Sequence, residues 1–266
     1  MSALEPSTQD PWQVLRALTD ARIALGRAGS SVPTGAQLDF QWAHAQARDA
    51  VHHPIDLGVM KAALENLSPE VCIVRSAAKD RPTYLQRPDL GRRLDSESRS
   101  LLKARASKTM ESPDVVFVIA DGLSALAIER NAARLLSCLF PVLRAQAFTL
   151  APLILVQQGR VAIGDEIGEV LKAKMVAILI GERPGLSSPD SMGIYLSWQP
   201  KVGLHDSARN CLSNIRPQGM SDVVAVEKFM YLLREATRRK LTGVALKDET
   251  IQVGAMGLKR AQRLIL

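Results

Sequence analysis

Three short apolar runs, separated from one another by helical patterns, constrain the fold of this chain most. They are VVFVIA at residues 115–120, LILV at 153–156 and MVAILI at 175–180. Uninterrupted apolar runs of this length are typical of strands that are covered on both faces of a parallel sheet. Helical patterns at residues 125–145 and 165–172 connect them. The alternation predicts an α/β domain with a mainly parallel, Rossmann-like sheet and helices on both faces.

The segments before these runs have a mainly helical pattern. Apolar residues at helical spacing predict helices at residues 11–25, 35–51 and 56–67, and a short extended piece follows at 71–75. We therefore expect two domains. A small helical N-terminal domain with a basic linker occupies residues 1–110, and the α/β domain occupies residues 111–266.

The α/β domain continues beyond its third apolar run. Residues 193–198 form a fourth extended run, and residues 199–219 are predicted to be a loop region that contains Cys211. Ser221 is a suitable N-cap for a long final helix at residues 222–240.

A polar, glycine-containing loop follows each of the three apolar strands. These loops are DGLS at residues 121–124, QQGRV at 157–161 and GERPG at 181–185. The carboxyl ends of parallel strands meet at one edge of the sheet, which is the usual ligand edge of α/β folds. The sequence therefore predicts a ligand site at this edge, with Glu182 among its polar groups.

Composition excludes several classes of protein. Hydrophobic residues make up 47% of the chain, no apolar run is long enough to cross a bilayer, and the N-terminus has no signal-peptide core. We therefore expect a cytoplasmic protein without a membrane partner. The net charge of +7 is spread along the chain, and only five Phe, three Tyr and three Trp offer stacking surfaces, so we expect no nucleic-acid partner.

Common catalytic and metal motifs are also missing from the sequence. The three cysteines lie far apart and the four histidines show no ligand spacing, so no metal site is expected. Neither a G-x-S-x-G elbow nor a Walker lysine motif occurs. Gly159, Gly164 and Gly168 precede a helix, but their spacing differs from that of a dinucleotide fingerprint, and Asp165 and Glu166 would repel a pyrophosphate there.

Six motifs nevertheless occur in a characteristic order. They are GRAG at residues 26–29, YLQRPDLGRRL at 84–94, DGLSA at 121–125, GRVAIGDEIGE at 159–169, IGERPGL at 180–186 and CLSNIRPQG at 211–219. In this order the chain resembles the small (light) subunit of ethanolamine ammonia-lyase, over about residues 22–240. The resemblance implies an adenosylcobalamin-dependent lyase that converts ethanolamine to acetaldehyde and ammonia by a radical mechanism. It also implies a hetero-oligomer in which a large barrel subunit binds the substrate and this chain completes the cobalamin site.

The resemblance assigns three cofactor contacts to this sequence. They are Val161 in the GRV motif, Glu182 in GERPG and Cys211 in CxSNI. A corrin ring is an apolar disc rimmed with carboxamides, so an apolar Val161 and an acceptor such as Glu182 suit it, and Cys211 can pack as a small, soft residue. The sequence has no Asp-x-His-x-x-Gly motif, which is consistent with base-on binding of adenosylcobalamin. We expect no catalytic, metal-binding or substrate-binding residue in this chain, which would be active only with the large subunit.

Two other interpretations stay open at this point. The chain would also be compatible with a non-catalytic α/β partner that binds no corrin, or with a nucleotide-binding protein of similar fold. Enteric members of the family carry a longer N-terminal extension associated with a bacterial microcompartment. Because the N-terminus of this sequence is short, we expect a cytoplasmic location and leave encapsulation in a microcompartment open.

Overall fold

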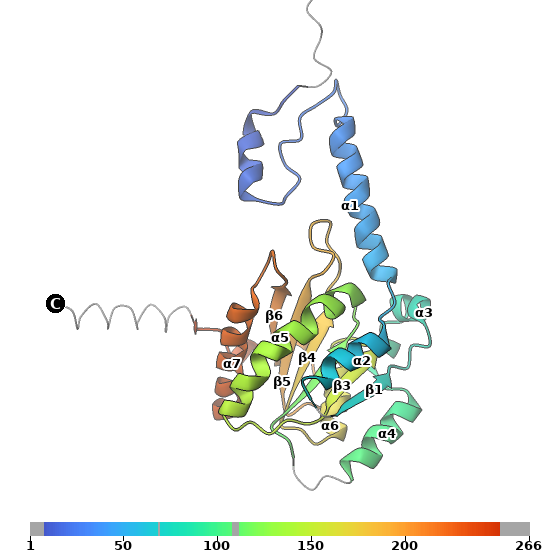
Figure 1. Cartoon of the computed structure of the whole chain (residues 1–266), viewed down its shortest axis with the longest axis vertical. Helices are drawn as coiled ribbons and strands as arrows, with labels where there is room; N and C mark the ends of the chain where they lie inside the picture. The colour runs from blue at the N-terminus through green and yellow to red at the C-terminus, as the bar shows by residue number, and fades with distance from the viewer. Residues whose placement is uncertain (1–7, 69, 108–111, 251–266) are drawn as a thin grey trace, which may run out of the picture.

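A six-stranded sheet forms the centre of the molecule (Figure 1). The computed structural model describes residues 8–68, 70–107 and 112–250. The strands lie side by side in the order β1-β3-β2-β4-β5-β6. Their bounds are β1 Val71–Arg75, β2 Val115–Ala120, β3 Leu153–Gln157, β4 Met175–Gly181, β5 Met192–Trp198 and β6 Arg209–Ile215.

The α/β class is confirmed, but the sheet is mixed, so the prediction of a mainly parallel sheet was wrong. β1 pairs with β3, β3 with β2 and β2 with β4 in parallel, whereas β5 is antiparallel to both β4 and β6. The reason lies in the connections. Only residues 182–191 link β4 to β5, and only residues 199–208 link β5 to β6. Both links are too short for a crossover helix, so each strand must return beside its predecessor.

Buried strands divide the core into two layers. In β2, Val115, Phe117 and Ile119 face one hydrophobic cluster, and the alternate residues face the other. The first cluster packs under the helices α5 (Ala125–Ala145), α7 (Asp222–Arg239) and α2 (Leu57–Glu65), and the second under α4 (Ser96–Ala106) and α6 (Ile163–Val170). This double cover explains why the strand sequences lack polar alternation.

Local capping fixes where the helices begin. The Ser124 side chain accepts a hydrogen bond of 3.2 Å from the Ala127 N–H at the start of α5, and Asp95 accepts one of 2.7 Å from Ser98 N–H at the start of α4. Caps of this kind stabilise a helix by about 1 kcal/mol each. The predictions for residues 125–145 and 222–240 therefore agree closely with α5 and α7.

A separate helical N-terminal domain, which the sequence predicted, is not what the structure shows. Helix α2 buries Met60 and Leu64 in the first core cluster, and β1 is an edge strand of the main sheet. These apolar side chains join the larger core because the sheet offers the nearest surface on which to bury them. The predicted domain boundary between residues 110 and 111 falls within 108–111, which lie outside the described residues.

The first part of the chain extends away from the sheet. It contains a short 3-10 helix, η1 (Pro11–Leu18), where the sequence predicted a longer helix, and α1 (Thr34–His52), as predicted. Figure 1 shows α1 running past the end of the sheet. Within the described residues, none of the helices combines the length and hydrophobicity that a membrane span requires.

Candidate functional site

Glu182 is held at the carboxyl end of β4 as an oriented hydrogen-bond acceptor. Its backbone N–H donates to the Ser191 carbonyl at 2.9 Å, which directs the side chain across β5 towards β6. The Ser191 hydroxyl donates to Oε2 at 2.5 Å and the Ser213 hydroxyl to Oε1 at 2.6 Å, while the Asn214 N–H donates to Oε2 at 3.2 Å. A carboxylate offers about four lone-pair sites, so these three donors leave acceptor capacity for a ligand.

Gly193 on β5 makes room for this carboxylate. A Cβ at position 193 would lie only 2.7 Å from Glu182 Oε1. Any side chain there would push the carboxylate out of its hydrogen bonds. The glycine is therefore required by the position of Glu182 and not by its own backbone conformation.

Cys211 lies on the same face of the sheet as Glu182. It is exposed on β6 and directly opposite Tyr195 of β5, which is half-buried. The sequence placed Cys211 in a loop, which was wrong: it belongs to a strand. Partial burial raises the pKa of its thiol, a hydrogen bond with Tyr195 lowers the pKa, and the negative charge of Glu182 raises it. Cys211 is therefore a neutral, packing thiol at physiological pH.

Val161 lies on the same side of the sheet, before α6. It lies in the loop between β3 and α6, is half-buried, and packs against the second core cluster, as does Tyr195. On this face, α4 and α6 lie over the second core cluster, whereas the β5–β6 end leaves Tyr195 partly exposed and Cys211 and Ser213 exposed. We call the surface made by this end together with Glu182 and Val161 the open face.

A polar groove of about 450 Å³ adjoins the loop that carries Val161. Its lining includes Ala162, Arg92 and His205. The groove adds charged groups of both signs, from Arg92 and Arg93 and from Asp89 and Asp206, beside the loop that carries Val161. Together the two surfaces could accept a ligand that is apolar in its centre and polar at its rim.

The exit loops of β2 and β3 are closed by bonds within the chain. Asp121 is 2% exposed, and its carboxylate accepts hydrogen bonds from the N–H groups of Gly122, Gln158 and Gly159 at 2.9–3.0 Å. The Arg81 guanidinium also contacts the first loop, where it donates to the Gly122 carbonyl at 2.7 Å. Of the three loops expected to form the ligand edge, the first two are therefore tied to each other by Asp121, and the third carries Glu182.

The acidic first turn of α6 also has a structural role. Glu166 is 3% exposed and accepts from Arg99 Nε at 2.6 Å and from the Leu94 N–H at 2.9 Å. Asp165 is 1% exposed and pairs with Arg209 of β6. These two carboxylates therefore anchor neighbouring segments to α6 and leave no room for a phosphate at its N-terminus.

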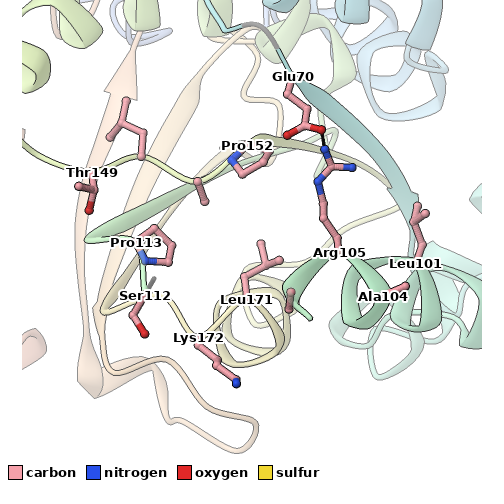
Figure 2. Close-up of a pocket in the computed structure, with 13 residues that line it drawn as sticks. Glu70, Leu101, Ala104, Arg105, Ser112, Pro113, Thr149, Pro152, Leu171 and Lys172 are labelled. Carbon is pink, nitrogen blue, oxygen red and sulfur yellow. Dashed lines mark ion pairs between the residues drawn. The ribbon is translucent and has the colours of Figure 1, made fainter. Parts of the chain in front are cut away.

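A second cavity, of about 550 Å³, lies at the amino ends of the strands (Figure 2). Figure 2 shows Leu101, Pro113, Pro152 and Leu171 around it, with an ion pair between Glu70 and Arg105 at one side. The charges of this pair neutralise each other, and the other lining groups are mostly apolar. Residues 108–111 lie outside the described residues. Among the described residues that line this cavity, Ser112, Thr149 and Lys172 add polar groups, but none of the candidate residues Val161, Glu182 and Cys211 is among them, so the open face remains the candidate site.

Three residues of the open face were not predicted from the sequence. They are Ser191 and Ser213, which hold Glu182, and Tyr195, which lies opposite Cys211. The strand period of two could have placed Cys211 and Ser213 on one face. Because residues 199–219 were predicted to be a loop, this signal was not applied to them.

The environment of Cys211 gives a first testable prediction. Since burial and the charge of Glu182 raise the pKa of the thiol, we expect Cys211 to react slowly with iodoacetamide at pH 8 and faster only above the ordinary thiol pKa. In a Glu182→Gln variant the midpoint should move to lower pH. Peptide mass spectrometry measures the rate at each cysteine, and the exposed Cys138 reports on reagent access. Rapid reaction of Cys211 at neutral pH would contradict this account.

The fold and the open face define an α/β protein whose mixed sheet leaves one strand face partly uncovered. In the parts of the chain that the structure describes, no group of three His, Cys, Asp or Glu side chains could hold a metal ion. Comparison with known proteins gives the family. The family model described as ethanolamine ammonia-lyase light chain matches residues 9–247. The chain belongs to this family, and the resemblance noted from its motifs is confirmed.

Similar proteins match along most of their length. A protein of Azotobacter vinelandii is 57% identical, over 94% of this chain and 92% of its own length. One of Ralstonia nicotianae is 56% identical, over 91% of this chain and 89% of its own length. One of Pseudomonas aeruginosa is 54% identical, over 92% of this chain and 90% of its own length. All three are named ethanolamine ammonia-lyase small subunit.

Proposed function

We propose that this chain is the small subunit of an adenosylcobalamin-dependent ethanolamine ammonia-lyase, and that its open face supplies one wall of the cobalamin site. The observation that carries the proposal is the fixed Glu182 carboxylate at the border of an uncovered strand face. The name of the relatives, small subunit, implies a larger partner. That partner would be a large barrel subunit that binds ethanolamine and covers the open face.

The residues of the open face fit the chemistry of a corrin. Val161, Cys211 and the Tyr195 ring present mainly apolar, uncharged surface. Glu182 has remaining lone pairs that can accept from a carboxamide N–H at the corrin rim. A neutral Cys211 thiol suits close packing better than a thiolate would.

In this proposal the chain binds and orients the cofactor. Adenosylcobalamin, when bound, supplies the radical chemistry by homolysis of its cobalt–carbon bond. This chain would hold the corrin, with Glu182 at its rim and Val161 and Cys211 on its apolar surface, and would exclude water from it. No acid or base of this chain is needed at the substrate, which lies in the large subunit.

The test is a double variant, Glu182→Ala with Val161→Arg, co-expressed with the cognate large subunit. We expect about 100-fold weaker cobalamin binding, because a charge-assisted hydrogen bond is lost and a bulky cation enters the apolar surface. Acetaldehyde release at limiting cofactor should fall in parallel. Cobalamin affinity is measured by titration of the absorbance spectrum of the complex.

A matched control combines the same two kinds of substitution at positions away from the open face. Glu235 lies on α7 and pairs with Arg238 on the surface, and Val244 is 77% exposed. The Glu235→Ala, Val244→Arg variant should bind cobalamin like the wild type. If the Glu182, Val161 variant binds as tightly as this control, the assignment of the site is wrong, and the non-catalytic partner becomes the better interpretation. Acetaldehyde release by this chain without the large subunit would contradict the proposed division of roles.

A further inference from the structure

Residues 8–52 form an N-terminal arm that has little core of its own. None of the residues of η1 is buried, and the only buried residues of α1 are Ala43 and Ala50. Figure 1 shows α1 rising past the sheet at the end where the β4–β5 loop projects, with η1 beyond that loop. A helix of this length, at 1.5 Å per residue, spans roughly 30 Å. The arm therefore extends far beyond the compact part of the chain.

The arm exposes an unusual amount of large apolar side chain. Trp12 is 66% exposed, Trp42 is 68% exposed and Leu18 is 81% exposed. Two of the three tryptophans of the chain therefore lie exposed on the arm. Other exposed apolar residues of the arm are Val14, Leu15, Ile23, Val32, Leu38 and Phe40. Monomeric proteins seldom leave such a surface in water, so a partner is expected to cover it.

The charge of the arm identifies the kind of partner. Its four arginines are balanced by four aspartates, although the whole chain carries a net charge of +7. A surface that binds a polyanion or an anionic lipid carries an excess of basic residues, which the arm lacks. A neutral surface rich in tryptophan is typical instead of the buried centre of a protein–protein interface.

We propose that the N-terminal arm docks onto the large subunit, with Trp12 and Trp42 as its anchors. This inference rests on the proposed function, because it takes the large subunit as the partner that closes the open face. Glu182 lies at the carboxyl end of β4, and the arm passes the same end of the sheet. A large subunit that covers Glu182 therefore lies within reach of the arm, and the two surfaces belong to one continuous interface.

The experiment measures assembly of the full chain with its cognate large subunit. Trp12→Ala and Trp42→Ala should each weaken the complex at least about 30-fold in a sedimentation or calorimetric titration. Because both side chains are exposed in the free chain, its circular dichroism should not change. Val244→Ala, which removes a 77% exposed apolar side chain outside the arm, is the matched control and should assemble like the wild type. Amide hydrogen exchange in residues 8–52 should slow on assembly.

The outcomes separate this inference from the cofactor proposal. If the tryptophan variants weaken assembly but the wild-type complex binds no cobalamin, the docking surface stands and the cofactor proposal fails. If the variants assemble as tightly as the control and exchange in the arm does not slow, the docking surface is wrong, even when the complex releases acetaldehyde. Exchange in the arm that slows with the concentration of this chain alone, and no further with the large subunit, would assign the arm to self-association and overturn the proposal.

Discussion

Replacing Asp121 with alanine is expected to lower the free energy of unfolding by about 3–5 kcal/mol at pH 7.5, because three buried N–H groups lose their acceptor at once. The carboxylate receives the N–H groups of Gly122, Gln158 and Gly159, and it lies 3.8 Å from the Arg81 guanidinium. Water has little access to a residue that is 2% exposed. Urea unfolding of the purified chain measures the loss.

Asp121→Asn is the graded control for this prediction. The amide keeps one oxygen that can serve Gly122 and Gly159, but it turns an NH₂ group towards the Gln158 N–H and Arg81. We expect a loss between those of the wild type and the alanine variant. A loss below about 1 kcal/mol for Asp121→Ala would show that the two loops hold together without this carboxylate.

The same variant should change the pH dependence of stability. Burial raises the pKa of Asp121 from its ordinary value of 3.8 to about 6, against the lowering effect of its hydrogen bonds and of Arg81. A folded-state pKa above the unfolded value means that this contribution is complete below about pH 4 and is lost as the pH rises through 6. The difference in unfolding free energy between wild type and Asp121→Ala should therefore be larger at pH 4.5 than at pH 7.5, by about 2 kcal/mol.

Replacing Arg209 with methionine is expected to cost about 3–5 kcal/mol, because it leaves Asp165 as a buried charge without a partner. Both side chains of this ion pair are 2% exposed. Arg209 also donates to the Leu204 carbonyl at 3.1 Å and to Asp206 at 2.9 Å. The pair joins α6 to β6 beneath the open face, so we expect weaker cobalamin binding as well as lower stability.

A double variant tests whether the charge is the cause. Asp165→Leu combined with Arg209→Met removes both charges and replaces them with apolar groups of similar size, which is often close to neutral for buried ion pairs. Its stability should return to within about 2 kcal/mol of the wild type. If the double variant is as unstable as Arg209→Met alone, lost packing and lost hydrogen bonds account for the cost.

Several elements could be predicted from the sequence because their determinants are local. The strand at residues 71–75, the strand at 115–120 and the helix at 125–145 have the bounds that the sequence predicted. Apolar runs, helical spacing and N-cap residues lie within a few positions of one another, so no distant part of the chain is needed to interpret them. The family likewise follows from six ordered motifs, which the comparisons confirmed.

The arrangement of strands at one side of the sheet could not be predicted in this way. The pairing of β5 and β6 depends on the short links before them. The sequence of β6, RNCLSNI, is mostly polar because much of the strand is exposed, so its residues do not indicate a strand. The position of α2 on the main core depends on the surface that the sheet offers to Met60 and Leu64. Both outcomes are set by contacts between residues that are far apart in the sequence.

The sequence by itself determined the α/β class, the buried strands and the three candidate contacts Val161, Glu182 and Cys211, because each rests on a local pattern or an ordered motif. Only the tertiary structure decided that Glu182 is fixed by Ser191 and Ser213, that Cys211 lies on a strand opposite Tyr195, and that the acids of α6 are buried in ion pairs. The physical reason is that hydrogen bonding and burial depend on which strands become neighbours. Because β5 runs antiparallel to β4 and to β6, it brings the end of β4 and the residues of β6 together.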